Sequence, residues 1–340
     1  MSLAEVEEHV RKAISDGKFG KYSEVDEVIL ESSMGDDQLV SKVAFTSVKL
    51  KHKMENRNEE VMIKMQQENE TLRLIMDTDR QFHNELLMYQ EILPYINKND
   101  IVQEIFPGFY QGRVTNGEEP LADFLIIENL SPFGYRLSPD KVNVDYDHVL
   151  LTFRQLGRFH ALSYSAKTKD YEGFVERIRK LLSIIYREDR KEGVNNVLKY
   201  FKLRGITPVL KEHKEELQPL IDALEDPVGL MLKMSTPEEP LAVVCHGDFC
   251  RNNIFYKYDN GRPVEVKFFD LARSKYCSPA IDLALFLFLN VPSKLRIEHW
   301  DDFLEAYHDG LSNAIPGTVV PSLDDVKEEM KKKAVYVYVL

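Results

Sequence analysis

The chain has 340 residues, of which 44% are apolar and 10% aromatic, enough for a sizeable core and for two lobes. Its 44 basic residues against 56 acidic ones give a formal net charge of −12, and without a long basic tract this argues against a nucleic-acid partner. Three cysteines supply no disulfide framework, and the longest apolar run, residues 283–289, is too short to cross a bilayer, so we expect a cytoplasmic protein without a membrane span.

The first elements are predicted to be a short helix and two strands. Apolar residues at helical spacing predict a helix over residues 3–15, and residues 27–30 and 39–48 have the composition of strands. Residues 32–37 between the strands could be the loop that covers the phosphates in a kinase, or an ordinary β-turn. The segment holds one glycine and two acids, and both interpretations stay open.

A lysine on the next strand is the first candidate for function. Residues 61–65 alternate as a strand after a polar turn at residues 55–58. Lys64 therefore takes the place of the third-strand lysine that holds the α- and β-phosphates in protein kinases. A lysine on a strand is usually a solvated edge residue. Here the apolar neighbours on both sides and the helix that follows favour phosphate binding.

That helix is predicted over residues 79–93, with Pro94 ending it. Glu85 lies beside its apolar face, where a carboxylate needs a cationic partner. We therefore pair Glu85 with Lys64 as part of the nucleotide site. Glu91, on the outer side of the same helix, is the alternative.

Residues 109–114 and 122–128 are predicted to form a hairpin whose second strand is apolar and stops abruptly at a polar segment. In a kinase-like fold this segment is the hinge, where backbone groups pair with the adenine edge of the nucleotide. The residues expected to do so are Glu128, Asn129 and Leu130.

The hinge is also the predicted boundary between a nucleotide-binding lobe, residues 1–128, and a catalytic and substrate lobe, residues 129–340. The second lobe should begin with a helix over residues 146–167. His160 lies on its apolar face, where a lone histidine is more often a core residue than a ligand. Residues 172–235 are predicted to form two or three further helices with solvated charged faces.

The most specific pattern follows the apolar residues 243–245: His246-Gly247-Asp248, then four residues, then Asn253. The protein-kinase catalytic loop has the same skeleton, with an Asp that accepts the proton of the attacking hydroxyl and an Asn that holds magnesium. We therefore predict Asp248 as the catalytic base and Asn253 as a metal ligand. His246 is expected to shape the loop through hydrogen bonds.

A second predicted hairpin, residues 254–269, carries another candidate ligand at its end. With Asn260-Gly261 as a two-residue turn, the pairing puts Asn253 opposite Phe268 and Asp270 one diagonal step away, about 7–8 Å from Asn253. Magnesium is commonly held by one or two carboxylate or amide oxygens, with waters and phosphates completing its octahedron. ATP and Mg²⁺ are therefore the expected cofactors.

The chain is predicted to end in further helices, the first running from Ala280 to about Leu289 after Ser278-Pro279. Asp282, in its first turn, could be stabilised by the helix macrodipole alone. Helices near residues 294–313 and 322–333 follow.

His246-Gly247-Asp248 with Asn253, Asp270 after two phenylalanines, and the run from Ser278 to Leu283 together resemble the ecdysteroid kinase-like family. The family is similar to choline and aminoglycoside kinases. The resemblance implies an α+β, bilobal protein kinase-like fold, with an N-terminal antiparallel-sheet lobe and a mainly helical C-terminal lobe. It also implies that Asp282 braces the catalytic loop by accepting hydrogen bonds. Ala272 departs from the family, which commonly carries Gln at this place.

The predicted reaction transfers the γ-phosphoryl group of ATP to the hydroxyl of a small molecule. The resemblance implies an ecdysteroid-like sterol or another lipophilic alcohol, and the sequence indicates no protein partner. One alternative is a pseudokinase that binds nucleotide or a lipophilic ligand without turnover, as the glycine-poor loop and Ala272 suggest. A metal-dependent hydrolase using His246, Asp248 and Asp270 is disfavoured, because no second close-spaced histidine motif exists. Cys245 and Cys250 are interpreted as small, partly buried thiols.

Overall fold

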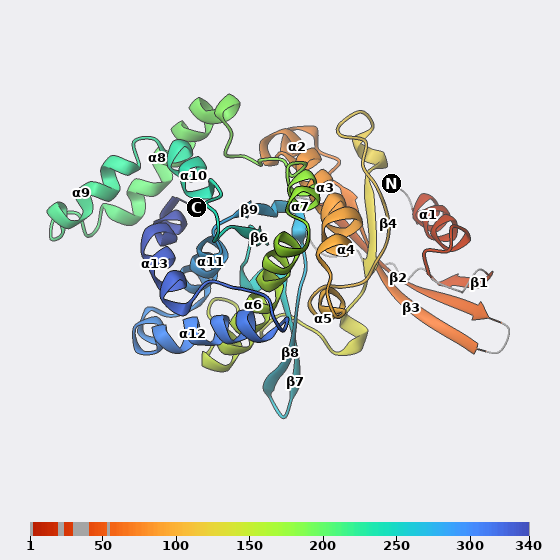
Figure 1. Cartoon of the computed structure of the whole chain (residues 1–340). Coiled ribbons are helices and arrows are strands. Elements are labelled where there is room, and N and C mark those ends of the chain that lie inside the picture. Colours follow the sequence, from red (N-terminus) through yellow and green to blue (C-terminus); the bar gives the residue numbers. More distant parts are fainter. Residues whose placement is uncertain (1–2, 20–23, 30–40, 53–54, 340) are drawn as a thin grey trace. The chain divides into compact units, whose positions relative to one another are not determined.

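The computed structural model describes residues 3–19, 24–29, 41–52 and 55–339, and these form two compact units (Figure 1). The first unit comprises Met1–Leu137 and Ile254–Ala272, and the second comprises Ser138–Asn253 and Arg273–Leu340. The lobe boundary predicted after Glu128 stays a prediction. The compact units themselves divide nine residues later along the chain, and the first also takes in the second predicted hairpin.

The first unit is built on a five-stranded antiparallel sheet of order β1-β2-β3-β5-β4. Its strands are β1 (Glu24–Ile29), β2 (Ser41–His52), β3 (Glu55–Gln66), β4 (Phe109–Arg113) and β5 (Phe124–Glu128). The predicted strands are confirmed where they fall on described residues. The polar turn predicted at residues 55–58 is wrong, because β2 and β3 pair over their whole length, from Ser41↔Gln66 to His52↔Glu55. The loop at residues 32–37 lies outside the described residues.

The core of the first unit forms where a helix covers this sheet. Helix α1 (Leu3–Ser15) confirms the predicted bounds, and it buries Val10, Ala13 and Ile14 against strand residues such as Val48 and Ile63. Fully burying an aliphatic side chain of this size contributes about 1.5–3 kcal/mol. The same cluster includes Phe124 at the start of β5, so the helix and the central strands are packed as one body.

The helical segment after β3 is longer than predicted. Helices α2 (Glu70–Met76) and α3 (Thr78–Leu87) come first. A π-helical turn (Met88–Ile92), α4 (Leu93–Ile96) and α5 (Ile101–Ile105) follow. The prediction that Pro94 ends the helix is wrong. The proline lies in the first turn of α4, directly after the wider π-helical turn, where a missing backbone N–H is tolerated.

The first unit also contains the hairpin of β7 (Ile254–Asp259) and β8 (Arg262–Phe268), turned by Asn260 and Gly261 at positive φ, as predicted. The predicted pairing of Asn253 with Phe268 is wrong, because Phe268 pairs with Ile254. The register shifts by one at a bulge between Lys257 and Tyr258. It arises beside Pro263, which cannot donate a ladder hydrogen bond.

The second unit is mainly helical, which together with the antiparallel sheet of the first confirms the predicted α+β class. Its helices are α6 (Tyr146–Lys169), α7 (Tyr171–Ile178), α8 (Lys191–Ile206), α9 (Lys214–Ala223), α10 (Pro227–Ser235), α11 (Ala280–Asn290), α12 (Ser293–Asn313) and α13 (Leu323–Lys333). Residues 171–235 thus hold four α-helices rather than two or three. None of the described helices is long and apolar enough to cross a membrane.

Two helices of the second unit cross closely at glycines. A Cβ on Gly157 of α6 would lie 2.1 Å from the carbonyl oxygen of Tyr307, and one on Gly310 of α12 would lie 1.9 Å from that of Arg154. Strands β6 (Val243–Cys245) and β9 (Lys275–Cys277) pair antiparallel in the same unit. The last described segment, Ala334–Val339, is a 3₁₀ helix whose Tyr336 is buried.

Candidate active site

Lys64 on β3 lies at the centre of a buried charge cluster in the first unit. Its Nζ is 2.6 Å from Oε2 of Glu85 on α3 and 3.0 Å from Oδ1 of Asp270. The exposed fractions of Lys64 and Glu85 are 5% and 1%. Burial alone would lower the pKa of Lys64, but the carboxylates of Asp270 and Glu85 outweigh it and raise that pKa above its usual value. The amine is therefore charged at neutral pH.

The contact between Lys64 and Glu85 confirms the predicted pairing, and the alternative Glu91 is exposed. The second carboxylate of the cluster, Asp270, was predicted only as a metal ligand. Its backbone has φ +65°, a left-handed conformation that is uncommon for a residue with a side chain. Asp and Asn adopt this conformation more readily than other residues with a side chain, as Asp77 and Asn116 also do here.

Replacing Glu85 by Ala is expected to lower the free energy of unfolding by about 3 kcal/mol, because Lys64 would lose the buried one of its two carboxylate partners. This loss lies at the low end of the range for a broken buried ion pair, because the Asp270 carboxylate still pairs with the Lys64 amine. Urea unfolding of the full chain measures it. The matched control Glu91→Ala, on the exposed side of the same helical segment, should change the free energy by less than about 0.5 kcal/mol. Equal effects of the two changes would contradict the assignment.

The predicted catalytic loop lies in the second unit and is held by a buried carboxylate. Backbone N–H groups of His246 and Gly247 donate to Oδ2 and Oδ1 of Asp282, at 2.7 and 2.9 Å. His160 also lies 3.4 Å from Asp282 Oδ2 and 3.0 Å from the Tyr307 hydroxyl. Burial favours the neutral acid, but the hydrogen bonds and nearby imidazoles lower the pKa of Asp282 and keep it ionised. The structure thus confirms the bracing role of Asp282 and the place of His160 in the core.

Within this loop the structure brings His246, Asp248 and Asn253 together. The Asn253 amide nitrogen donates to the backbone oxygen of Asp248 at 2.8 Å and to its Oδ2 at 3.3 Å, and Asp248 N–H donates to His246 Nδ1 at 3.4 Å. Because the Asn253 nitrogen is engaged, its amide oxygen is the atom that can meet a cation. Gly247 has φ +82°, and a Cβ there would lie 1.9 Å from the Arg273 carbonyl oxygen, so the turn requires glycine.

At the predicted hinge, two backbone donors already have partners. Glu128 N–H donates to the Gly108 carbonyl oxygen at 2.7 Å, and Asn129 N–H donates to that of Glu60 at 2.8 Å. Of the three predicted hinge residues, Leu130 is therefore the one whose backbone N–H could donate to adenine. A hollow of 280 Å³ borders this segment within the first unit, with Thr46 and Asn129 among its lining residues.

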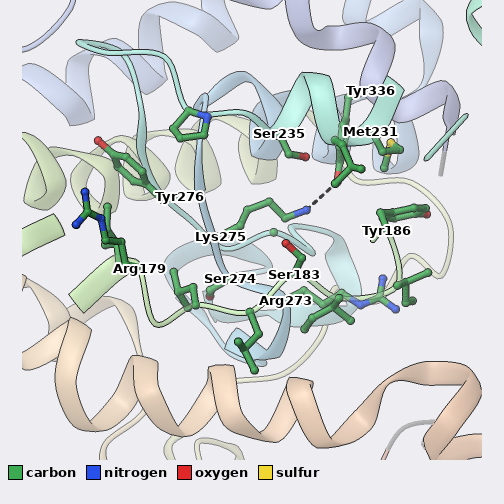
Figure 2. A pocket seen from close by; sticks show the side chains of 18 residues that line it. Arg179, Ser183, Tyr186, Met231, Ser235, Arg273, Ser274, Lys275, Tyr276 and Tyr336 are labelled. Atoms are coloured by element: carbon green, nitrogen blue, oxygen red, sulfur yellow. Dashed lines mark hydrogen bonds between the residues drawn. The ribbon is translucent and has the colours of Figure 1, made fainter. Parts of the chain in front are cut away.

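The second unit holds a further cavity of 330 Å³ that the sequence did not predict (Figure 2). It is lined by the segment after α7, by α10, by residues around β9 and by Gly247 of the predicted catalytic loop. Residues 172–235 carry no pattern that distinguishes a pocket wall from a solvated helix. The only hint in the sequence is the apolar run near the end of the chain, which contributes Tyr336.

Comparisons with known proteins give one family match and several solved structures. The model of the ecdysteroid kinase-like family matches residues 36–316, more than half of the chain. No curated protein matches the chain. Among solved structures, an aminoglycoside-3′-phosphotransferase of type VIII is 15% identical, with TM-score 0.42 over 92% of this chain and 93% of that one.

Two more solved structures show a similar degree of likeness. Macrolide 2′-phosphotransferase MphH from Brachybacterium faecium is 14% identical, with TM-score 0.43 over 95% of this chain and 89% of that one. A microcompartment-associated aminopropanol kinase is 10% identical, with TM-score 0.37 over 97% and 88%.

Proposed function

The chain belongs to the ecdysteroid kinase-like family, and from this premise we propose that it is an ATP-dependent kinase that phosphorylates the hydroxyl group of a small metabolite. Family membership confirms the prediction of a phosphotransferase with an alcohol acceptor. The observation that carries the use of a nucleotide is the buried Lys64, held by Glu85 and Asp270 in the manner of a phosphate-binding lysine.

The proposed chemistry assigns a separate task to each residue. Lys64, kept charged by its two carboxylates, binds the α- and β-phosphates of ATP. Asp248 orients the acceptor hydroxyl and takes its proton as the oxygen bonds to the γ-phosphorus. The bond between that phosphorus and the β–γ bridging oxygen breaks, and ADP leaves. Asp282 and His246 hold the loop that carries Asp248 and transfer no proton themselves.

Asn253 and Asp270 would hold the Mg²⁺. One amide oxygen and one carboxylate fit this ion, which prefers a few protein oxygens and keeps sites for water and phosphate. The two residues belong to different compact units, so the support comes from the chain itself: Asn253 directly precedes β7, and Asp270 follows β8 by two residues. When bound, the ion would neutralise the negative charge on the phosphates.

The acceptor we propose from the family is an ecdysteroid-like sterol or another lipophilic alcohol. A thermal-shift assay with ATP, with and without Mg²⁺, tests nucleotide binding. At an ATP concentration of 100 times Kd, stabilisation of about 2.7 kcal/mol is expected only when Mg²⁺ is present. ATP consumption is then measured with sterol, choline-like and aminoglycoside acceptors.

Consumption of ATP with one of these alcohols would support the kinase. No stabilisation by ATP under any condition would contradict the proposal. Stabilisation without consumption by any alcohol would instead favour a pseudokinase that binds nucleotide without turnover.

A further inference from the structure

The 330 Å³ cavity of the second unit adjoins the catalytic loop, because Gly247 lines it and directly precedes Asp248. Its size is near the lower end of the usual range for small-molecule sites, about 300–1,000 Å³. Both the cavity and Asp248 lie in the same compact unit. A molecule held there would therefore lie beside the loop that carries the proposed base.

Most of the wall is apolar. The segment after α7 contributes leucine and isoleucine side chains such as Leu181 and Ile184, and α10 contributes Met231 and Leu232. Ile185 in the same segment has φ +56°, which is a strained conformation for a β-branched residue. The body of a matching ligand should accordingly be apolar, because burying it here removes hydrocarbon surface from water on both sides.

The charge on the wall has one sign. Arg179, Arg273 and Lys275 all line the cavity, and none of its described lining residues is Asp or Glu. Arg179 is exposed, whereas Arg273 and Lys275 are half-buried. A cationic amine would meet repulsion from these side chains, and none of the residues that line the cavity offers it a carboxylate.

Lys275 is the most confined of these cations. Its Nζ donates to the Tyr336 hydroxyl at 2.9 Å and lies 5.4 Å from the centre of that ring, as the dashed line in Figure 2 shows. In the part of the chain that the structure describes, no carboxylate lies within ion-pair distance of Lys275 or Arg273. A partly desolvated cation with neutral partners is stabilised by an anion.

A polar atom without a partner lies at the same wall. The Ser274 hydroxyl belongs to a residue that is 1% exposed, and among the described residues it has no hydrogen-bond partner. The oxygen itself is closed off from the cavity, so it is no contact for a ligand. The cavity thus offers two cations, Arg273 and Lys275, beside an apolar surface.

We propose that this cavity binds the acceptor, and that the acceptor is an apolar alcohol bearing an anionic group, such as a carboxylate, that Lys275 and Arg273 recognise. The inference rests on the proposed function for the phosphorylation itself, but the binding it describes needs no nucleotide. The charge of the cavity wall thus disfavours amino alcohols and, among the acceptors proposed above, favours a lipophilic alcohol with an acid group over a neutral sterol.

Calorimetry on the full chain without nucleotide tests the proposal with three probes of equal length: ω-hydroxydecanoate, decanediol and ω-aminodecanol. The hydroxy acid should bind at least about tenfold more tightly than the diol, because it adds a charge-assisted contact, and the amine should bind most weakly. Equal or tighter binding of the amine would overturn the proposal.

Variants of Lys275 test whether this side chain binds the carboxylate of the hydroxy acid. Lys275→Met should lower affinity for the hydroxy acid about tenfold and leave the diol unchanged, whereas Lys275→Arg should retain most of the preference. The matched control is Lys331→Met, on an exposed face of α13 in the same unit. Should Lys275→Met fail to melt cooperatively, Arg273→Gln serves instead. Unchanged acid preference in a folded variant would overturn the assignment.

The nucleotide is the other possible source of an anion, and titration of ATP with Mg²⁺ into Lys275→Met separates the two. The affinity of this variant for ATP should equal that of the unaltered chain. A loss of ATP affinity as large as the loss of hydroxy-acid affinity would show that Lys275 binds a nucleotide phosphate, and it would overturn the proposal. If the hydroxy acid binds as expected and ATP is never consumed, the proposed kinase activity fails and the binding site stands.

Discussion

Replacing Asp248 by Asn is expected to lower turnover by about 10²–10⁴-fold, the usual contribution of a positioned general base, while ATP binding stays unchanged. Asn keeps the size and shape of the Asp side chain but cannot accept the proton of the hydroxyl. The loop should survive it, because main-chain groups of Asp248 support it: the N–H donates to His246, and the carbonyl accepts from Asn253. Steady-state ATP consumption with the identified acceptor measures the loss, and calorimetry measures the nucleotide affinity.

The matched control for this change is Asp259→Asn, at the exposed turn of the β7–β8 hairpin. It makes the same chemical substitution outside the proposed site and should leave turnover as it was. Unchanged turnover in the Asp248 variant would refute its assignment as base. A loss of ATP affinity equal to the loss of turnover would show instead that the residue serves nucleotide binding.

Replacing Asp270 by Ala is expected to abolish the dependence of nucleotide binding on magnesium, weakening ATP binding by at least about 10–100-fold. Removing even the outer hydrogen-bond partners of a metal site has an effect of this size. Lys64 keeps its contact with Glu85 at 2.6 Å, so the sheet that carries it should remain folded. Titration of ATP with and without Mg²⁺ by calorimetry measures the effect.

Asp270→Gly is the companion variant, because glycine adopts the φ of +65° without steric cost and alanine does not. Both variants should lose the magnesium dependence, and the glycine variant should be more stable than the alanine variant by about 1 kcal/mol. Wild-type ATP affinity with Mg²⁺ in either variant would count decisively against Asp270 as a ligand of the ion.

The sequence predicted the features whose signals are short and periodic. The helix at residues 3–15 and the strand around Lys64 are confirmed, because side-chain burial repeats with the period of each element. The spacing of Asp248 and Asn253 by itself indicates a kinase-like loop, and family membership confirms the enzyme class. The pairing of Lys64 with Glu85 was also accessible, since a buried carboxylate calls for a cation and Lys64 lies on the preceding strand.

Two predictions that depended on an uninterrupted hydrogen-bond pattern were wrong. Pro94 was expected to end a helix, but a preceding π-helical turn accommodates it. The register of the second hairpin was wrong by one residue, because a bulge beside Pro263 cannot be counted from the turn alone. Both predictions assumed a regular helix or a regular hairpin, and the structure has a π-helical turn in the first and a bulge in the second.

By itself, the sequence determined the class of chemistry from an Asp, an Asn and a second Asp at kinase-like spacing, and from the strand and helix that carry Lys64 and Glu85. Only the tertiary structure decided that Asp270, 206 positions away, also contacts Lys64. It likewise decided that Lys275 meets Tyr336 at the wall of an acid-free cavity. The physical reason is that periodicity and motif spacing depend on neighbouring residues, whereas such contacts depend on how the folded chain returns on itself.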